Sequence, residues 1–179
     1  MSYLQKLLNF ISIIFLTFNM ATAKTNKNDN ILYLQLKDGT VKIEMYPEIA
    51  PNHVKRIKEL VTEGFYDGLK FHRVIDGFMA QTGDPKGNGT GGSGQNIKQE
   101  FSDLPHKRGA VSMARSANPD SADSQFFIVF DEASFLDGQY TVWGQVIDGM
   151  EFVDKIKKGN SANNGSVNNP DKIIKMSIK

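Results

Sequence analysis

The sequence contains no cysteine, carries almost no net charge, and its longest hydrophobic run is short. Without cysteine there is no disulfide, no thiolate nucleophile and no zinc–thiolate site. A formal net charge of +1 argues against a nucleic-acid-binding protein, which normally has a basic excess or a basic patch. The 179 residues are 40% hydrophobic, which is enough for one globular domain with a core.

Histidine is scarce as well. The 3 histidines, His53, His72 and His106, have a spacing that matches no helical or hairpin metal motif, so we expect no metal and no cofactor. We expect His53 in the first turn of a helix and His106 in a loop, both exposed. The G-x-S-x-G elbow of many hydrolases is absent, so Ser112 and Ser124 are interpreted as structural hydroxyls.

A glycine-rich stretch, residues 87–92, satisfies the G-x-G-x-x-G pattern of dinucleotide-binding proteins. That fingerprint requires a strand before it and an apolar helix after it, whereas the polar residues 93–96 follow here. No glycine of the stretch is followed by Lys-Ser or Lys-Thr, so it is not a P-loop either. We interpret it as a tight loop without bulky side chains beside a cleft.

The N-terminus has the pattern of a secretory signal peptide. Lys6 precedes an apolar run from Leu7 to Phe18, and Ala21-Thr22-Ala23 provides a small-x-small cleavage site. The run is short against the roughly 20 residues of a membrane span, so an uncleaved anchor or a core helix is the less favoured alternative. We therefore predict export without a stable membrane anchor, with a signal peptide at 1–23, a polar tail at 24–30 and one folded domain at 31–179.

From Ile31 onward, short β-rich runs alternate with turn residues. Two amphipathic stretches interrupt them and predict helices, from Pro51 to about Gly64 and from Met150 to about Lys157. Many short strands with two isolated helices predict a mainly β fold, a closed antiparallel barrel of roughly eight strands capped by two helices. The strands are expected at residues 31–36, 41–46, 69–75, 78–82, 110–114, 126–130, 141–147 and 172–178.

Several blocks of sequence in this order resemble the cyclophilin-type peptidyl-prolyl cis-trans isomerases: residues 71–84, 88–92, 109–116, 124–128 and 136–144. The resemblance covers about residues 31–179 and implies an eight-stranded antiparallel barrel capped by two helices. It also implies an enzyme that rotates X-Pro bonds in unfolded or extended polypeptides and assists the folding of exported proteins. A folding helper or scaffold that binds proline segments without turnover remains the alternative.

The resemblance also implies roles for individual residues. Arg73 resembles the family's catalytic arginine. Phe135 and Tyr140 stand where many eukaryotic members have tryptophan and histidine, which is similar to bacterial members and implies weak cyclosporin binding. Together with the signal-peptide pattern, this pair favours a bacterial periplasm, and we also expect a monomer. The residues that resemble the substrate groove are His72, Phe78, Met79, Gln81, Ala114, Arg115, Ser116, Gln125, Phe127, Phe135, Leu136 and Tyr140.

The implied reaction explains why no nucleophile is needed. Amide resonance opposes rotation with a barrier of about 20 kcal/mol, and in the twisted state the proline nitrogen regains a basic lone pair. A guanidinium that donates to this nitrogen binds the twisted state better than the planar one. One such bond contributes about 1.5–3 kcal/mol, whereas a 10⁴-fold acceleration needs about 5.5 kcal/mol. A dry pocket that holds the ring must supply the rest.

Strand geometry allows two further predictions. A three-residue hairpin loop that includes Phe78 would pair Arg73 with Gln81, whereas a two-residue loop would pair it with Ala80. The mechanism favours the three-residue loop. Because successive strand residues face opposite sides, Phe126 and Phe127 cannot both point into the same core.

Overall fold

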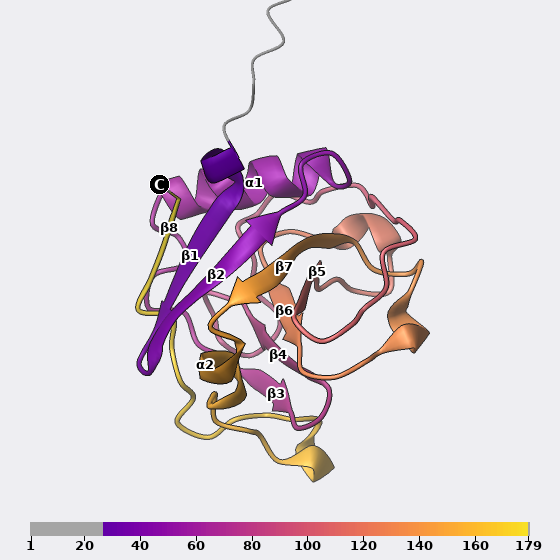
Figure 1. The fold of residues 1–179 in the computed structure, drawn as a ribbon. Helices are drawn as coiled ribbons and strands as arrows, with labels where there is room; N and C mark the ends of the chain where they lie inside the picture. The colour runs from indigo at the N-terminus through magenta and orange to yellow at the C-terminus, as the bar shows by residue number, and fades with distance from the viewer. Residues whose placement is uncertain (1–26, 179) are drawn as a thin grey trace, which may run out of the picture.

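The computed structural model describes residues 27–178, whose centre is one eight-stranded antiparallel sheet with two α-helices (Figure 1). The strands lie in the order β3-β4-β6-β5-β7-β2-β1-β8, so the predicted mainly β fold is confirmed. The helices are α1 (Pro51–Thr62) and α2 (Met150–Asp154). The strands are β1 (Ile31–Leu36), β2 (Gly39–Met45), β3 (Arg73–Ile75), β4 (Met79–Thr82), β5 (Ala110–Met113), β6 (Phe126–Val129), β7 (Val142–Asp148) and β8 (Lys175–Ile178).

The sheet curls into a half-barrel, and the prediction of a closed barrel is corrected in this respect. Within residues 27–178 the edge strands β3 and β8 do not pair with each other. The segments before them meet instead, since the Phe71 N–H donates to the Asp171 carbonyl and the Ile173 N–H to the Leu69 carbonyl, both at 2.9 Å. These isolated contacts replace a ladder, which explains why β3 and β8 are shorter than predicted.

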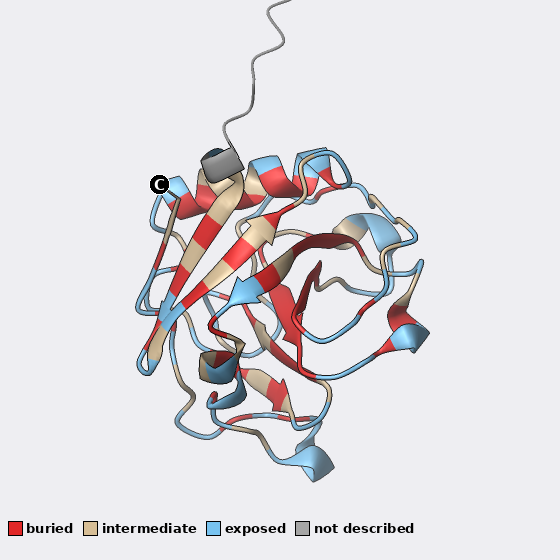
Figure 2. Cartoon of the chain, in the orientation of Figure 1, coloured by how far each residue is buried: buried red, intermediate tan, exposed pale blue. Residues whose placement is uncertain are grey.

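Helix α1 follows the sequence pattern closely. Pro51 occupies its first turn, where the missing N–H costs nothing, and Gly64 takes a φ of 70° just beyond its end. Its buried stripe faces the sheet (Figure 2). Helix α2 ends earlier than predicted, at Asp154, although Val153 and Ile156 are buried as expected.

Phe126 and Phe127 point to opposite sides of β6, as predicted. Phe126 packs edge-on against Tyr66 and Trp143, each at a ring-centroid distance of 5.6 Å, in the large core that includes α1. Phe127 belongs to a second, smaller hydrophobic cluster. The buried members of this second cluster are Met79, Ala110, Phe127, Val129, Ala133, Leu136 and Val142.

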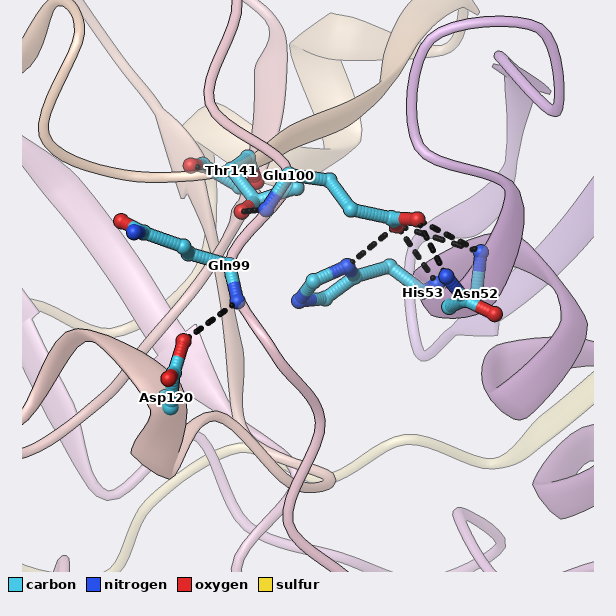
Figure 3. A network of polar contacts seen from close by, with 7 residues as sticks. Asn52, His53, Gln99, Glu100, Asp120 and Thr141 are labelled. Atoms are coloured by element: carbon cyan, nitrogen blue, oxygen red, sulfur yellow. Dashed lines mark hydrogen bonds and ion pairs between the residues drawn. The ribbon is translucent and has the colours of Figure 1, made fainter.

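The expectation that His53 and His106 are exposed is wrong, because each is 0% exposed. The Nδ1 atom of His53 lies 2.6 Å from the Glu100 carboxylate, which also accepts the N–H groups of Asn52 and His53 at the start of α1 (Figure 3). The Nδ1 atom of His106 lies 2.9 Å from Oδ1 of Asp137, and its Nε2 atom lies 3.0 Å from the buried Ser112 hydroxyl. These hydrogen bonds satisfy both ring nitrogens of His106 and the Nδ1 atom of His53, whose Nε2 atom has no partner among the described residues.

Ser112 and Ser124 are structural hydroxyls, as predicted. Both are fully buried. The Ser112 hydroxyl donates to the Thr141 carbonyl at 2.9 Å, and the Ser124 hydroxyl donates to the Gly83 carbonyl at 2.8 Å. Each therefore joins two segments of the fold.

Ser112, His106 and Asp137 are connected in the order of a hydrolytic triad, with Ser112 Oγ 3.0 Å from His106 Nε2 and Asp137 2.9 Å from Nδ1. Ser112 and His106 are both 0% exposed and the hydroxyl donates to a main-chain carbonyl, so no substrate can reach this serine as a nucleophile.

Candidate active site

A row of side chains crosses the sheet at the site. Arg73 on β3 pairs with Gln81 on β4, which confirms the three-residue hairpin loop, and Gln81 in turn pairs with Phe127 on β6. Directly paired residues of antiparallel strands project from the same face. The register therefore places the guanidinium, an amide and an aromatic ring side by side.

A cavity of about 280 Å³ opens at this row, and we call it the apolar cavity because aromatic and aliphatic side chains make up most of its lining residues. The rings of Phe127 and Tyr140 meet edge-on with their centroids 6.0 Å apart. Phe135 is 65% exposed, and its ring centroid lies 5.3 Å from that of Phe78. The cavity thus has an aromatic base and an exposed aromatic rim. Its lining residues are Arg73, Phe78, Met79, Gln81, Ala114, Arg115, Phe127, Phe135, Leu136 and Tyr140.

A second, polar cavity of about 340 Å³ is adjacent, and Gln81, Ala114 and Arg115 line both. The glycine-rich loop, residues 87–92, forms one side of it, as the sequence predicted for a loop beside a cleft. A peptide with an apolar ring in the apolar cavity could extend into the polar cavity over this shared wall. The residues that line the polar cavity are Gln81, Gly89, Thr90, Gly91, Gly92, Asn96, Ala114, Arg115, Ser116, Ser121, Asp123 and Gln125.

Arg73 is held on two sides. Its Nη1 donates to Oε1 of Gln81 at 3.1 Å, while Nε and Nη2 donate to the carbonyl and Oδ1 of Asn164 at 3.1 and 3.0 Å. A guanidinium has five N–H groups, so two remain for a ligand. Burial lowers the pKa of Arg73, an effect that Tyr140 opposes, but an arginine stays charged at neutral pH.

The two glutamines form a relay behind the arginine. Gln81 Nε2 donates to Gln125 Oε1 at 2.9 Å. Gln125 Nε2 donates to the carbonyls of Gly89 and Gly91 at 3.1 and 2.8 Å. The relay connects Arg73 to the glycine-rich loop through side chains that also line the cavities.

Arg115 is fixed at the shared wall. Its guanidinium lies 4.4 Å from the ring centroid of Tyr140 and donates to the carbonyls of Gln139 and Ser116 at 2.8 and 2.9 Å. A cation over an aromatic face is attracted by the ring quadrupole. Tyr140 therefore has a cationic neighbour, and both residues line the apolar cavity.

The structure brings together all of the sequence-predicted site residues except His72. This residue lines neither cavity, and its predicted place in the substrate groove stays a prediction. It is 8% exposed, neither ring nitrogen has a hydrogen-bond partner among the described residues, and burial lowers its pKa. His72 lies instead close to Gly89, since a Cβ there would be 3.8 Å from its Nε2 atom.

Asn164 is the residue that sequence reasoning missed. Asn164-Gly165 indicates a turn, and Asn164 has a left-handed φ of 50°. Nothing in that pattern indicates a contact with Arg73, which lies 91 positions earlier.

Residues 27–178 contain neither a candidate metal site nor a helix that could cross a membrane. In that part of the chain no three histidine, aspartate or glutamate side chains come together as metal ligands. None of its helices combines the length and the apolar character that crossing a bilayer requires.

Comparison with known proteins identifies the family. Residues 31–178 match the model described as cyclophilin type peptidyl-prolyl cis-trans isomerase/CLD. A Brucella suis protein named probable peptidyl-prolyl cis-trans isomerase is 52% identical over 192 residues, which cover 100% of this chain and 98% of that protein. The peptidyl-prolyl cis-trans isomerase B of Bacillus subtilis is 48% identical over 130 residues, covering 71% and 90% of the two chains.

A solved structure agrees with these matches. The cyclophilin type isomerase of Cryptosporidium parvum, crystallised in the presence of the dipeptide Ala-Pro, has a TM-score of 0.75 at 29% identity and covers 83% of this chain and 98% of its own. The chain belongs to the cyclophilin-type peptidyl-prolyl cis-trans isomerases. Its activity is that of the family, acceleration of rotation about the peptide bond that precedes proline.

Proposed function

We propose that Arg73 is the catalytic group and that it acts on the nitrogen of a proline held in the apolar cavity. The observation that carries this proposal is the placement of Arg73 at the cavity with two N–H groups uncommitted and three fixed. A donor fixed in advance stabilises developing lone-pair density without reorganising at the moment of reaction.

The cavity walls supply the second part of the proposed mechanism. The proline ring lies against Phe127, Met79 and Leu136, which are 5%, 1% and 7% exposed and pack together in the second hydrophobic cluster. With the ring held and water excluded, the carbonyl before it can rotate while Arg73 bonds the pyramidal nitrogen. The chain before proline runs over the shared wall of Gln81, Ala114 and Arg115. The Ala-Pro dipeptide used with the Cryptosporidium parvum relative supports proline segments as ligands.

The Arg73→Ala variant tests this mechanism in a protease-coupled or exchange NMR isomerisation assay. We expect it to lose most of the activity while its melting temperature stays near that of the wild type. Arg108→Ala is the matched control, because Arg108 also bonds a carbonyl and pairs with Asp154 but lies outside both cavities. Full activity in folded Arg73→Ala would show that the arginine is not the catalytic group.

We further propose that the enzyme is exported, most simply to a bacterial periplasm, where it assists the folding of other exported proteins. The support is the sequence pattern of residues 1–23, which lie outside the described residues, together with the bacterial relatives. N-terminal sequencing of the protein from the cell envelope should begin near Lys24. A soluble product that begins at Met1 or Ser2 would contradict export by this route.

Two finer properties complete the proposal. The enzyme acts as a monomer, which size-exclusion chromatography with light scattering tests directly. It binds cyclosporin weakly, because Phe135 lacks the indole N–H of the tryptophan found in many eukaryotic relatives. The exposed position of Phe135 at the cavity rim supports this proposal, because a ligand in the cavity would contact its side chain.

A further inference from the structure

Asp84 is a buried carboxylate outside the mechanism proposed so far. It is 1% exposed, and in residues 27–178 it forms no ion pair with lysine or arginine. Its Oδ1 accepts the Lys86 N–H at 2.8 Å, and its Oδ2 accepts the N–H groups of Asn88 and Gly89 at 2.9 and 2.6 Å. Burial raises the pKa of the Asp84 carboxyl. The hydrogen bonds from the loop N–H groups lower it by more, so the pKa lies below its usual value.

These bonds fix the glycine-rich loop to the end of β4. Gly91 also lies against Asp84, since a Cβ on Gly91 would overlap with Oδ1 of the carboxylate. Two of the residues held in this way also meet Gln125. The carbonyls of Gly89, whose N–H Asp84 accepts, and of Gly91, which packs against the carboxylate, accept the bonds from Gln125 Nε2. Asp84 therefore sets where these two carbonyl oxygens lie.

The two carbonyls decide which way the glutamine amides face. A carbonyl oxygen only accepts, so Gln125 must present its NH₂ to the loop and its oxygen to Gln81. Gln81 must then present its NH₂ to Gln125 and its oxygen to Arg73, whose guanidinium only donates. The relay is consistent from both ends. If the loop carbonyls move, one end is no longer anchored.

We propose that Asp84 is a positioning residue for Arg73, acting through the glycine-rich loop and the glutamine relay. This inference rests on the proposed catalytic role of Arg73. The carboxylate holds the loop carbonyls, the carbonyls hold Gln125, and Gln125 keeps the oxygen of Gln81 against Nη1 of the arginine. The guanidinium is then held by Gln81 on one side and by Asn164 on the other.

The Asp84→Asn variant tests the proposal, because its NH₂ group would face a backbone N–H that the carboxylate now accepts. We expect kcat/KM to fall about fivefold to tenfold, mainly through kcat, since the cavity walls that bind the ring are unchanged. Asp171→Asn is the matched control, because Asp171 accepts the Lys157 N–H and pairs with Lys37 away from both cavities. The control should lower the melting temperature without lowering kcat.

A double-mutant cycle identifies the route. In a Gln125→Leu background the relay is already broken, so Asp84→Asn should cause no further loss of kcat. In ¹⁵N NMR spectra of Asp84→Asn, the side-chain NH₂ signals of Gln81 and Gln125 should move toward the positions of free glutamine. Folded Asp84→Asn with the wild-type kcat, or a loss that persists in full in the Gln125→Leu background, would overturn the proposal.

A second variant covers the case in which Asp84→Asn does not fold. Gly91→Ala leaves the carboxylate intact but forces Gly91 away from it, and Gly91 does not have a left-handed φ that alanine would strain. Gly91→Ala should lower kcat, as Asp84→Asn does, and an unchanged kcat would count against the relay. The arginine variant separates the two ideas. If Arg73→Ala is inactive while both loop variants keep full kcat, the proposed mechanism stands and the relay from Asp84 is wrong.

Discussion

Asn164 accepts two hydrogen bonds from Arg73, one through its main-chain carbonyl at 3.1 Å and one through Oδ1 at 3.0 Å. The two acceptors bind Nε and Nη2 together, so they fix the plane of the guanidinium as well as its position. Gln81 holds the opposite side at Nη1. An arginine with three bonds made in advance loses less conformational entropy when it meets the transition state.

The Asn164→Gly variant should separate activity from stability. Glycine keeps the main-chain carbonyl and suits the left-handed φ of 50°, but it removes Oδ1. Losing one hydrogen bond to a charged group at this exposed position, about 1 kcal/mol, should lower kcat/KM about fivefold. Isomerisation kinetics and thermal unfolding of the same samples measure both effects, and the melting temperature should not fall.

Asn169 offers the control for this variant, because it has the same φ of 50° and lines neither cavity. Asn169→Gly makes the same backbone change away from Arg73 and should leave kcat/KM unchanged. An equal loss in both variants would mean that backbone freedom, rather than the bond to Arg73, sets the rate.

Local patterns in the sequence predicted the elements that local physics decides. Helix α1 begins at Pro51 with its apolar stripe facing the sheet, and the hairpin at Asp76-Gly77 has the predicted register of Arg73 with Gln81. Proline at a first turn and the period of two in strands act within a few residues, so one sequence is sufficient to detect them.

Contacts between distant segments could not be predicted in this way. His53 is buried because Glu100, 47 positions away, accepts its ring N–H, and His106 because Asp137, 31 positions away, lies beside it. The cap that Asn164 provides for Arg73 spans 91 positions. No periodicity joins such pairs, so the polar partners of buried side chains emerge only when the chain folds.

The matched variants Phe126→Leu and Phe127→Leu should separate core packing from catalysis. Both rings are buried on β6, at 0% and 5% exposed, so each variant should lose about 1–2 kcal/mol of unfolding free energy. Of these two rings, only Phe127 lines the apolar cavity, and its flat ring is the surface against which we place proline. Denaturant unfolding and assays at equal folded concentration should therefore show about a tenfold loss of kcat/KM for Phe127→Leu and a near wild-type value for Phe126→Leu. Equal activities would exclude Phe127 as the base of the proline site.

The Phe135→Trp variant should strengthen cyclosporin binding. Phe135 is 65% exposed at the cavity rim, so a larger ring can be accommodated, and an indole adds an N–H donor that phenylalanine lacks. One additional hydrogen bond and more aromatic contact should raise the affinity about tenfold, which is about 1.4 kcal/mol. Calorimetric titration measures this change, while kcat/KM should stay within about twofold because the catalytic groups are unchanged. An unchanged dissociation constant would mean that this position does not limit the binding of the drug.

Acid should destabilise the fold through its buried histidines. Burial lowers the folded-state pKa of His53 and of His72 below the usual value of about 6.5, although Glu100 opposes the shift at His53. Below pH 6.5 the unfolded chain therefore binds more protons than the folded one, and the unfolding free energy falls until the lowered folded-state pKa values are passed. Hydrogen bonds from His53 and Asn52 overcome the effect of burial and keep the pKa of Glu100 low, so its contribution is lost at still lower pH.

Urea unfolding between pH 7.5 and 5.0 measures this dependence. His53→Asn keeps a side-chain N–H for Glu100 but does not titrate, so its stability should fall less steeply with acid than that of the wild type. The single variant His72→Phe should also flatten the curve, because phenylalanine does not titrate. The substitution breaks no hydrogen bond of the ring, since neither ring nitrogen of His72 has a partner among the described residues. A wild-type stability that stays constant over this range would show that neither ring is held neutral by the fold.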